Sequence, residues 1–88
     1  MSDDILEKIK ALKAELGKLE AAHAEKAGSA AGFADAAAYE AGRAKPSPKR
    51  LKLALDGLAD AVRELEATHP KLTAAAAEIC RDLTSLGI

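Results

Sequence analysis

The sequence has little of several features that mark common classes of protein. Its one cysteine, Cys80, excludes an intrachain disulfide and with it a secreted, disulfide-stapled scaffold. It has no uninterrupted apolar run of about 18 residues, so no transmembrane helix is predicted. Thirteen basic residues nearly balance fourteen acidic ones, which leaves no overall field to attract nucleic acid or anionic lipid. The first residues, Met-Ser-Asp-Asp, are acidic where a signal peptide is basic. These absences favour a soluble cytoplasmic protein of bacterial type.

Aromatic residues are also scarce, since Phe33 and Tyr39 are the only two. Alanine instead supplies 22 of the 88 residues, beside twelve leucines, four isoleucines and one valine. Alanine is the strongest helix former but buries little surface. The composition therefore predicts one all-α domain over residues 1–88, a small bundle of three to four helices with a thin core. Because small chains with thin cores often associate with themselves, we expect a homo-oligomer, either a dimer or a tetramer.

The strongest pattern is a heptad-type repeat of large aliphatic residues between positions 51 and 86. It predicts a helical seam sustained over five heptads. The seam residues are Leu51, Leu55, Leu58, Val62, Leu65, Leu72, Ile79, Leu83 and Leu86. Since heptad seams join helices to one another, we predict that these residues form an oligomer or partner interface.

A second seam predicts a helix over about residues 3–27, with Ser2 as its N-cap. Its apolar residues alternate in spacings of four and three, and they join the same predicted interface: Ile5, Ile9, Leu12, Leu16 and Leu19. Gly17 falls on the outer face and is expected to weaken the helix by about 1 kcal/mol. A parallel in-register pair of such helices would place Lys8 opposite Lys13, so antiparallel packing is favoured, within or between chains.

The segment between residues 28 and 44 is rich in alanine. Gly28-Ser29 is predicted to end the first helix and to cap a second one over about residues 30–43. Because the segment lacks large aliphatic residues, we expect it to be the weakest helix of the chain. It is interpreted as a partly mobile arm that docks through Phe33 and Tyr39.

A proline-rich step predicts the clearest boundary, at residues 45–47. Proline forces the residue before it out of the α-helical region, so Lys45 and Ser47 are expected to be non-helical. Ser47 then caps a helix over about residues 48–67, with Pro48 at its first position.

Pro70 predicts a second break, because proline removes a helical hydrogen bond and its ring clashes with the preceding turn. A last helix is then expected over about residues 70–86, with Gly87 as its C-terminal cap. The heptad repeat passes through Pro70 without a change of phase. One long kinked helix over residues 48–86 is therefore the alternative.

Three segments resemble a family of small bacterial proteins. They are Leu65-Glu66-Ala67-Thr68-His69-Pro70-Lys71-Leu72-Thr73, the ending Asp82-Leu83-Thr84-Ser85-Leu86-Gly87-Ile88 and, more loosely, Leu12-Lys13-Ala14-Glu15-Leu16. The family is domain of unknown function 4404, which has a similar His-Pro-x-Leu-Thr step and a similar ending. The alanine-rich middle departs from the family's more acidic middle. The resemblance implies a short helical protein without an assigned activity, and it carries over no catalytic or binding residues.

No cluster of residues predicts catalysis, a metal site or a cofactor. His69 suits a proton donor or a metal ligand, but a role in ending a helix before Pro70 is the favoured interpretation. His23 lies on the first seam, and two histidines paired across an oligomer fall short of the three or four ligands that zinc takes. Cys80 is expected to be a buried and inert thiol. We therefore expect no enzymatic activity.

Five basic residues form the one concentrated charge feature: Arg43, Lys45, Lys49, Arg50 and Lys52. In a nucleic-acid-associated protein these side chains would contact phosphates. No aromatic residue is interleaved for stacking on bases, however, and a solubilising surface patch is the simpler interpretation.

The leading hypothesis is a non-enzymatic protein–protein interaction module that acts as a homo-oligomeric helical scaffold, adaptor or regulator. Leu53 lies outside the seam beside the basic residues, and it is a candidate contact to another chain. The alternative is a nucleic-acid-associated protein that uses the segment 43–52. A membrane-surface helix ranks below both, because the polar faces lack the lysine richness of such helices.

Overall fold

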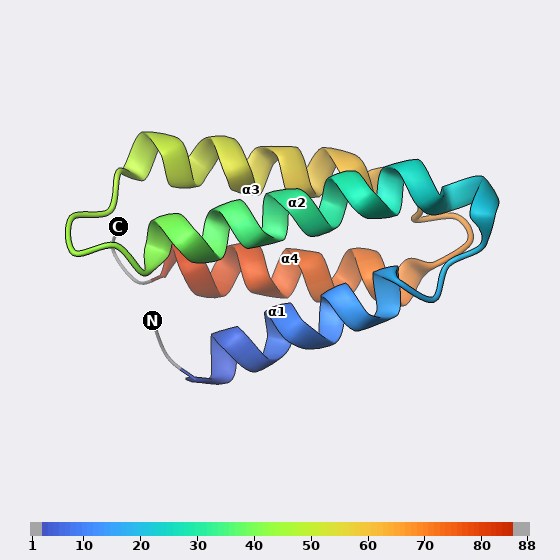
Figure 1. The fold of residues 1–88 in the computed structure, drawn as a ribbon, viewed down its shortest axis with the longest axis horizontal. Helices are drawn as coiled ribbons and strands as arrows, with labels where there is room; N and C mark the ends of the chain where they lie inside the picture. The colour runs from blue at the N-terminus through green and yellow to red at the C-terminus, as the bar shows by residue number, and fades with distance from the viewer. Residues whose placement is uncertain (1–2, 86–88) are drawn as a thin grey trace.

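The computed structural model describes residues 3–85 as four α-helices that run alternately up and down (Figure 1). They are α1 (Asp3–Leu16), α2 (Ala24–Ala41), α3 (Pro48–Arg63) and α4 (Pro70–Thr84), with a short 3₁₀ segment, η1 (Ala21–His23), before α2. Helix α1 packs against α2 and α4, and α3 packs against the same two helices. The predicted all-α bundle is confirmed, and no strand occurs between residues 3 and 85. The predicted caps Ser2 and Gly87 and the seam residue Leu86 lie outside the described residues.

The first predicted helix, over residues 3–27, is wrong in its second half. Helix α1 ends at Leu16, and the turn that follows is closed by the Gly17 N–H, which donates to the Lys13 carbonyl at 3.0 Å. Glycine has the lowest helix propensity after proline, and the chain reverses there so that α2 can run antiparallel to α1. Gly17 is therefore the end of the helix and not a weak point inside it. Leu19, beyond the turn, still packs half-buried against the core.

The predicted helix end at Gly28-Ser29 is also wrong, because both residues lie inside α2. Helix α2 is the longest of the four, with 18 residues, and the start predicted at residue 30 is six residues late. Its buried face is a line of alanines at alternating spacings of three and four: Ala27, Ala30, Ala34, Ala37 and Ala41. This is a heptad seam built from alanine. The expectation of a weak, mobile arm over residues 28–44 is replaced by a packed core helix.

The pair α2 and α3 forms the most extensive helix contact of the bundle. The small alanine side chains allow the two helices to approach closely, since interaxial distance depends on the side chains at the contact. Large side chains of α3 and of the turn that follows it, such as Leu58 and Leu65, are almost completely buried in the same core. Alanine thus contributes to the core through its position, although each side chain buries little surface.

The boundary at residues 45–47 is confirmed. Ser47 has an extended backbone, and its hydroxyl accepts a hydrogen bond from the Arg50 N–H at 3.3 Å, with Pro48 in the first helical turn. The predicted end at residue 67 is late, because α3 stops at Arg63.

The break at Pro70 is confirmed, and the alternative of one kinked helix over residues 48–86 is wrong. Residues 64–68 form turns in which the Leu65 N–H donates to the Val62 carbonyl and the His69 N–H donates to the Leu65 carbonyl. Pro70 then occupies the first turn of α4. The unbroken heptad phase did not require a continuous helix, because Leu65 enters the core from the turn after α3 and Leu72 enters the same core from α4.

Candidate interaction surface

The side chains predicted to form an oligomer interface lie in the core of one chain. Those buried are Ile5, Ile9, Leu12, Leu16, Leu51, Leu55, Leu58, Val62, Leu65, Leu72, Ile79 and Leu83. The structure therefore uses both seams within the chain, where the sequence predicted a contact between chains. The physical reason is that short connections bring four antiparallel helices together, so each seam finds a partner inside the same chain.

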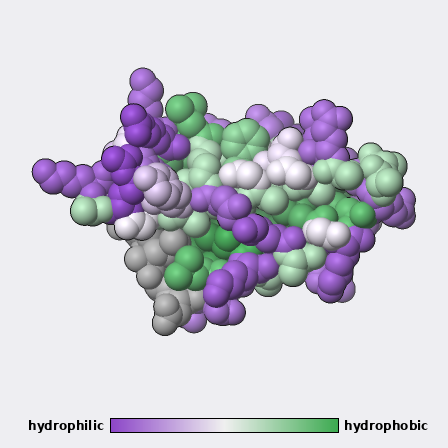
Figure 2. Space-filling view, viewed as in Figure 1, coloured by the Kyte–Doolittle hydropathy of each residue, from purple (hydrophilic) through white to green (hydrophobic). Residues whose placement is uncertain are grey.

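Large apolar side chains that remain exposed are found on α2 and α3. Within residues 4–85, whose side chains the structure describes, they are Phe33, Tyr39 and Leu53. Along the α3 edge of the molecule, Figure 2 shows hydrophobic surface with hydrophilic side chains at either end. Tyr39 is the most exposed of the three, so the arm predicted to dock through Phe33 and Tyr39 does not dock through Tyr39 within this chain. Its ring lies on a different side of α2 from Phe33, because six residues along a helix correspond to about 240° of rotation.

Phe33 lies across α3 at Gly57. A Cβ atom at residue 57 would stand only 2.4 Å from Cε1 and 2.5 Å from Cδ1 of the Phe33 ring. Glycine is therefore the residue that lets the ring rest against the backbone of α3. Leu53 precedes Gly57 by one helical turn and lies on the same face, since residues four apart are neighbours on a helix. Phe33, Leu53 and Gly57 together form one apolar patch across α2 and α3.

Charges of opposite sign flank this patch along α3. Lys49 and Arg50 lie one turn before Leu53, and Asp60 and Glu64 follow Gly57 on the same face. We call this surface, with its apolar centre, the α2–α3 face: Phe33, Lys49, Arg50, Leu53, Gly57, Asp60 and Glu64.

The acids of the α2–α3 face have partners on the surface. Asp60 pairs with Arg63 at 3.4 Å and Glu64 pairs with Lys26 of α2 at 3.0 Å. Within the described part of the chain, Lys49 and Arg50 form no ion pair. The basic end of the face is therefore exposed and unpaired among the described residues, and its acidic end forms exposed ion pairs that contribute little to stability.

The five basic residues predicted to contact phosphates fall into two groups, those paired with an acid and those exposed without one among the described residues. Arg43 donates to both carboxylate oxygens of Glu40, at 3.2 and 3.0 Å, and Glu40 is buried. Lys52 donates to Asp56 at 2.8 Å, and this hydrogen bond raises the pKa of Lys52. The remaining cations, Lys45, Lys49 and Arg50, are exposed at one end of the bundle. Fewer side chains are thus free for phosphates than the sequence suggested.

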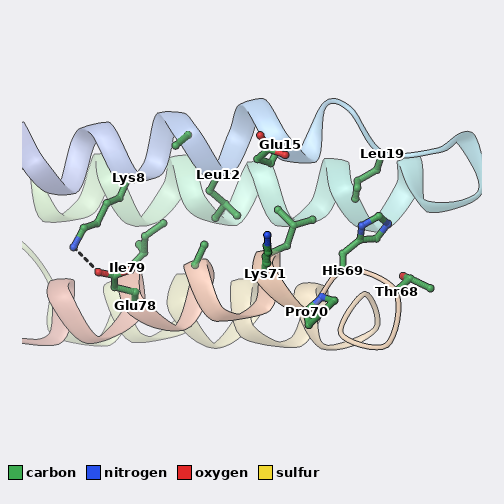
Figure 3. A pocket seen from close by; sticks show the side chains of 13 residues that line it. Lys8, Leu12, Glu15, Leu19, Thr68, His69, Pro70, Lys71, Glu78 and Ile79 are labelled. Carbon is green, nitrogen blue, oxygen red and sulfur yellow. Dashed lines mark ion pairs between the residues drawn. The ribbon is translucent and has the colours of Figure 1, made fainter.

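A second surface feature is a groove of about 660 Å³ between α1 and α4 (Figure 3). Its apolar lining includes Leu12, Leu19, Leu72 and Ile79. At one end, Lys8 pairs with Glu78 at 2.9 Å and donates to Asp82 at 2.6 Å, and His69-Pro70 closes the other end. The hydrogen bond to Asp82, followed by that to Glu78, raises the pKa of Lys8. Side chains of both signs line the groove, so it selects no ligand by charge.

The two histidines, considered as a pair across an oligomer in the sequence, meet within one chain. The His23 and His69 rings are in edge-to-face contact with centroids 5.6 Å apart, where η1 approaches the start of α4. His69 stands immediately before Pro70 as the N-cap residue of α4, although its side chain makes no capping hydrogen bond. Groups of three or more residues able to hold a metal ion are absent from the described part of the chain.

Cys80 is a half-buried free thiol. Its Sγ lies 3.9 Å from the Leu55 carbonyl oxygen. Burial, with a smaller contribution from the charge of Asp56, raises the pKa of the Cys80 thiol. A raised pKa keeps the thiol protonated at neutral pH, which agrees with the predicted inert cysteine.

Comparison with protein families shows a match between residues 5–88 and the model of DUF4404, a domain of unknown function. The chain belongs to this family. No curated protein and no protein of known structure matched this DUF4404 chain significantly. The resemblance seen in the sequence is thus confirmed, and it extends through the alanine-rich middle that looked divergent.

For this DUF4404 chain, sequence analysis missed the α2–α3 face as a unit. Leu53 was noted as a contact, but the acids after Gly57 and the fit of Phe33 against Gly57 were not. The spacing of Leu53, Gly57, Asp60 and Glu64 could have placed these residues on one side of α3. The approach of Phe33 to Gly57 joins two helices, and no local pattern signals it.

No described helix of the chain is long and apolar enough to cross a membrane.

Proposed function

We propose that this chain is a non-enzymatic protein-interaction module and that the α2–α3 face is its binding surface. The observation that carries the proposal is the contrast between the apolar seams, which are buried, and the apolar patch on α2 and α3, which is exposed. The seams are consumed inside the chain, whereas Phe33 and Leu53 stay exposed side by side with Gly57. Surface apolar patches rimmed by charged residues are typical of protein-binding sites.

Cross-linking in cells that naturally express the chain tests this function. A photo-reactive amino acid replaces Leu53, and a matched variant carries it at Ala74, an exposed position on α4. We expect protein adducts from position 53 and few from position 74. Equal adducts from both positions, or none from position 53, would contradict the proposal.

The alternative, association with nucleic acid, is supported by Lys45, Lys49 and Arg50, three exposed cations at one end of the bundle that form no ion pair with the described residues 3–85. Retention on a DNA or heparin column that weakens with salt, and that is lost when Lys49 and Arg50 become serine, would favour this alternative. We rank it second, because two of the five basic residues, Arg43 and Lys52, are paired with acids.

A further inference from the structure

We infer that the partner of the α2–α3 face is a second copy of this chain, bound antiparallel about a two-fold axis. The inference rests on the proposed function and names the occupant of the same surface. In a two-fold contact each residue of one copy meets the residue placed symmetrically about the axis, so the surface must be complementary to itself.

The positions of the charges supply this symmetry. Leu55 is the midpoint of α3 between Leu53 and Gly57, and it is equally the midpoint between Arg50 and Asp60. Arg50 and Asp60 therefore lie about 7.5 Å before and after the same point on the helix, at 1.5 Å per residue. A two-fold axis that lies outside α3 at the level of that point pairs the basic end of one copy with the acidic end of the other, twice. A parallel contact would instead set Arg50 against Arg50 and Asp60 against Asp60.

The same antiparallel register also aligns the apolar centres of the two copies. The axis that pairs Arg50 with the partner's Asp60 also places Leu53 over the partner's Gly57. The Phe33 ring fills the place of a side chain at Gly57, and because the ring is partly exposed it offers the incoming leucine an apolar surface. One register thus satisfies the charges and the apolar patch together.

Formation of this contact disturbs little within each copy. The pair between Asp60 and Arg63 is exposed on both sides, so Asp60 can exchange partners at low cost. Arg50 forms no ion pair in the described part of the chain and gains one across the interface.

The mass of the purified chain in solution, measured by light scattering and sedimentation over a concentration range, tests the inference. We expect a reversible dimer that Leu53→Glu converts to a monomer, while circular dichroism shows unchanged helicity. Lys71→Glu, an exposed charge reversal on α4, is the matched control and should leave the dimer intact.

Charge reversal tests the register. Arg50→Glu and Asp60→Arg should each weaken the dimer by about tenfold or more, because attraction becomes repulsion at two symmetric contacts. An equimolar mixture of the two variants should recover association, because the charges at positions 50 and 60 of one variant are then opposite to those of the other. The weakening by each single variant is what excludes a parallel contact, in which Arg50→Glu would only exchange one pair of like charges for another. Failure of the mixture to exceed the separate variants would overturn the antiparallel register.

The results also separate this inference from the proposed function. A monomer at every concentration, with cross-links from position 53 to a different protein, overturns self-association and leaves the interaction function standing. A dimer that persists in Leu53→Glu places self-association on another surface and overturns the inference. A monomer without specific cross-links overturns both.

Discussion

The contact between Phe33 and Gly57 makes a sharp prediction about stability. Replacement of Gly57 by alanine should raise helix propensity by about 1 kcal/mol, because glycine is the poorest helix former after proline. The new Cβ, however, would lie 2.4 to 2.6 Å from three atoms of the Phe33 ring, well inside ordinary contact distance. The ring must therefore leave its place on α3.

The size of the opposing effect follows from the exposure of the ring. Phe33 is 38% exposed, so moving it outward loses the remaining buried part. Since full burial of a phenylalanine is worth about 1.5–3 kcal/mol, the loss should be about 1–2 kcal/mol. In the natural chain Gly57→Ala should thus be neutral or destabilising by up to about 1 kcal/mol, and in a Phe33→Ala chain it should stabilise by about 1 kcal/mol.

A double-mutant cycle compares the effect of Gly57→Ala on the free energy of unfolding in chains with and without the Phe33 ring. Unfolding in urea is monitored by circular dichroism. We expect a coupling free energy of about 1–2 kcal/mol between the two positions. Each chain is compared at several protein concentrations, because self-association would add its own stabilisation. If Gly57→Ala had the same effect with and without the ring, within about 0.3 kcal/mol, the described contact would not exist in solution.

Three further predictions concern the rest of the bundle. Ala34→Leu should destabilise the fold by about 1–3 kcal/mol in urea denaturation, because it overfills the close contact between α2 and α3, whereas Ala74→Leu on the exposed side of α4 should be nearly neutral. The raised pKa of Lys8 means that its contribution to stability is complete at neutral pH and is lost as the pH rises above 10.5 through that raised pKa. Lys8→Met should therefore have a lower free energy of unfolding than the natural chain at pH 7, and this difference should become smaller at high pH. Urea denaturation of both chains over a range of pH measures the difference, and a difference that is constant with pH would refute the prediction. Alkylation of Cys80 at pH 8 should be slow in the folded chain and fast in urea, because burial raises the thiol pKa; equal rates would show that the thiol is exposed.

Local patterns in the sequence were enough to identify which large side chains are buried. The heptad repeat marks Leu58, Leu65 and Ile79 as core positions, since period fixes the face of a helix whatever its partner. Proline gave the boundaries at Pro48 and Pro70 for an equally local reason, the loss of a backbone donor and a fixed φ angle.

Helix ends at glycine were less predictable. Gly17 ends a helix and Gly28 does not, although both have the same low propensity. The difference lies in where the chain must turn to pack, because Gly28 is exposed on a helix whose alanine face is already held by α3. Propensity is a weak prior that tertiary contacts override.

The helical class, the buried positions of the seams and the proline boundaries could thus be predicted from residues that lie close together in the chain. Tertiary structure alone decided that the seams close within one chain, that alanines can form a core face, and that Phe33 rests on Gly57. These outcomes depend on how near two helices come, a distance set jointly by side chains far apart in sequence. The same geometry decided which surface remains for a partner, the α2–α3 face.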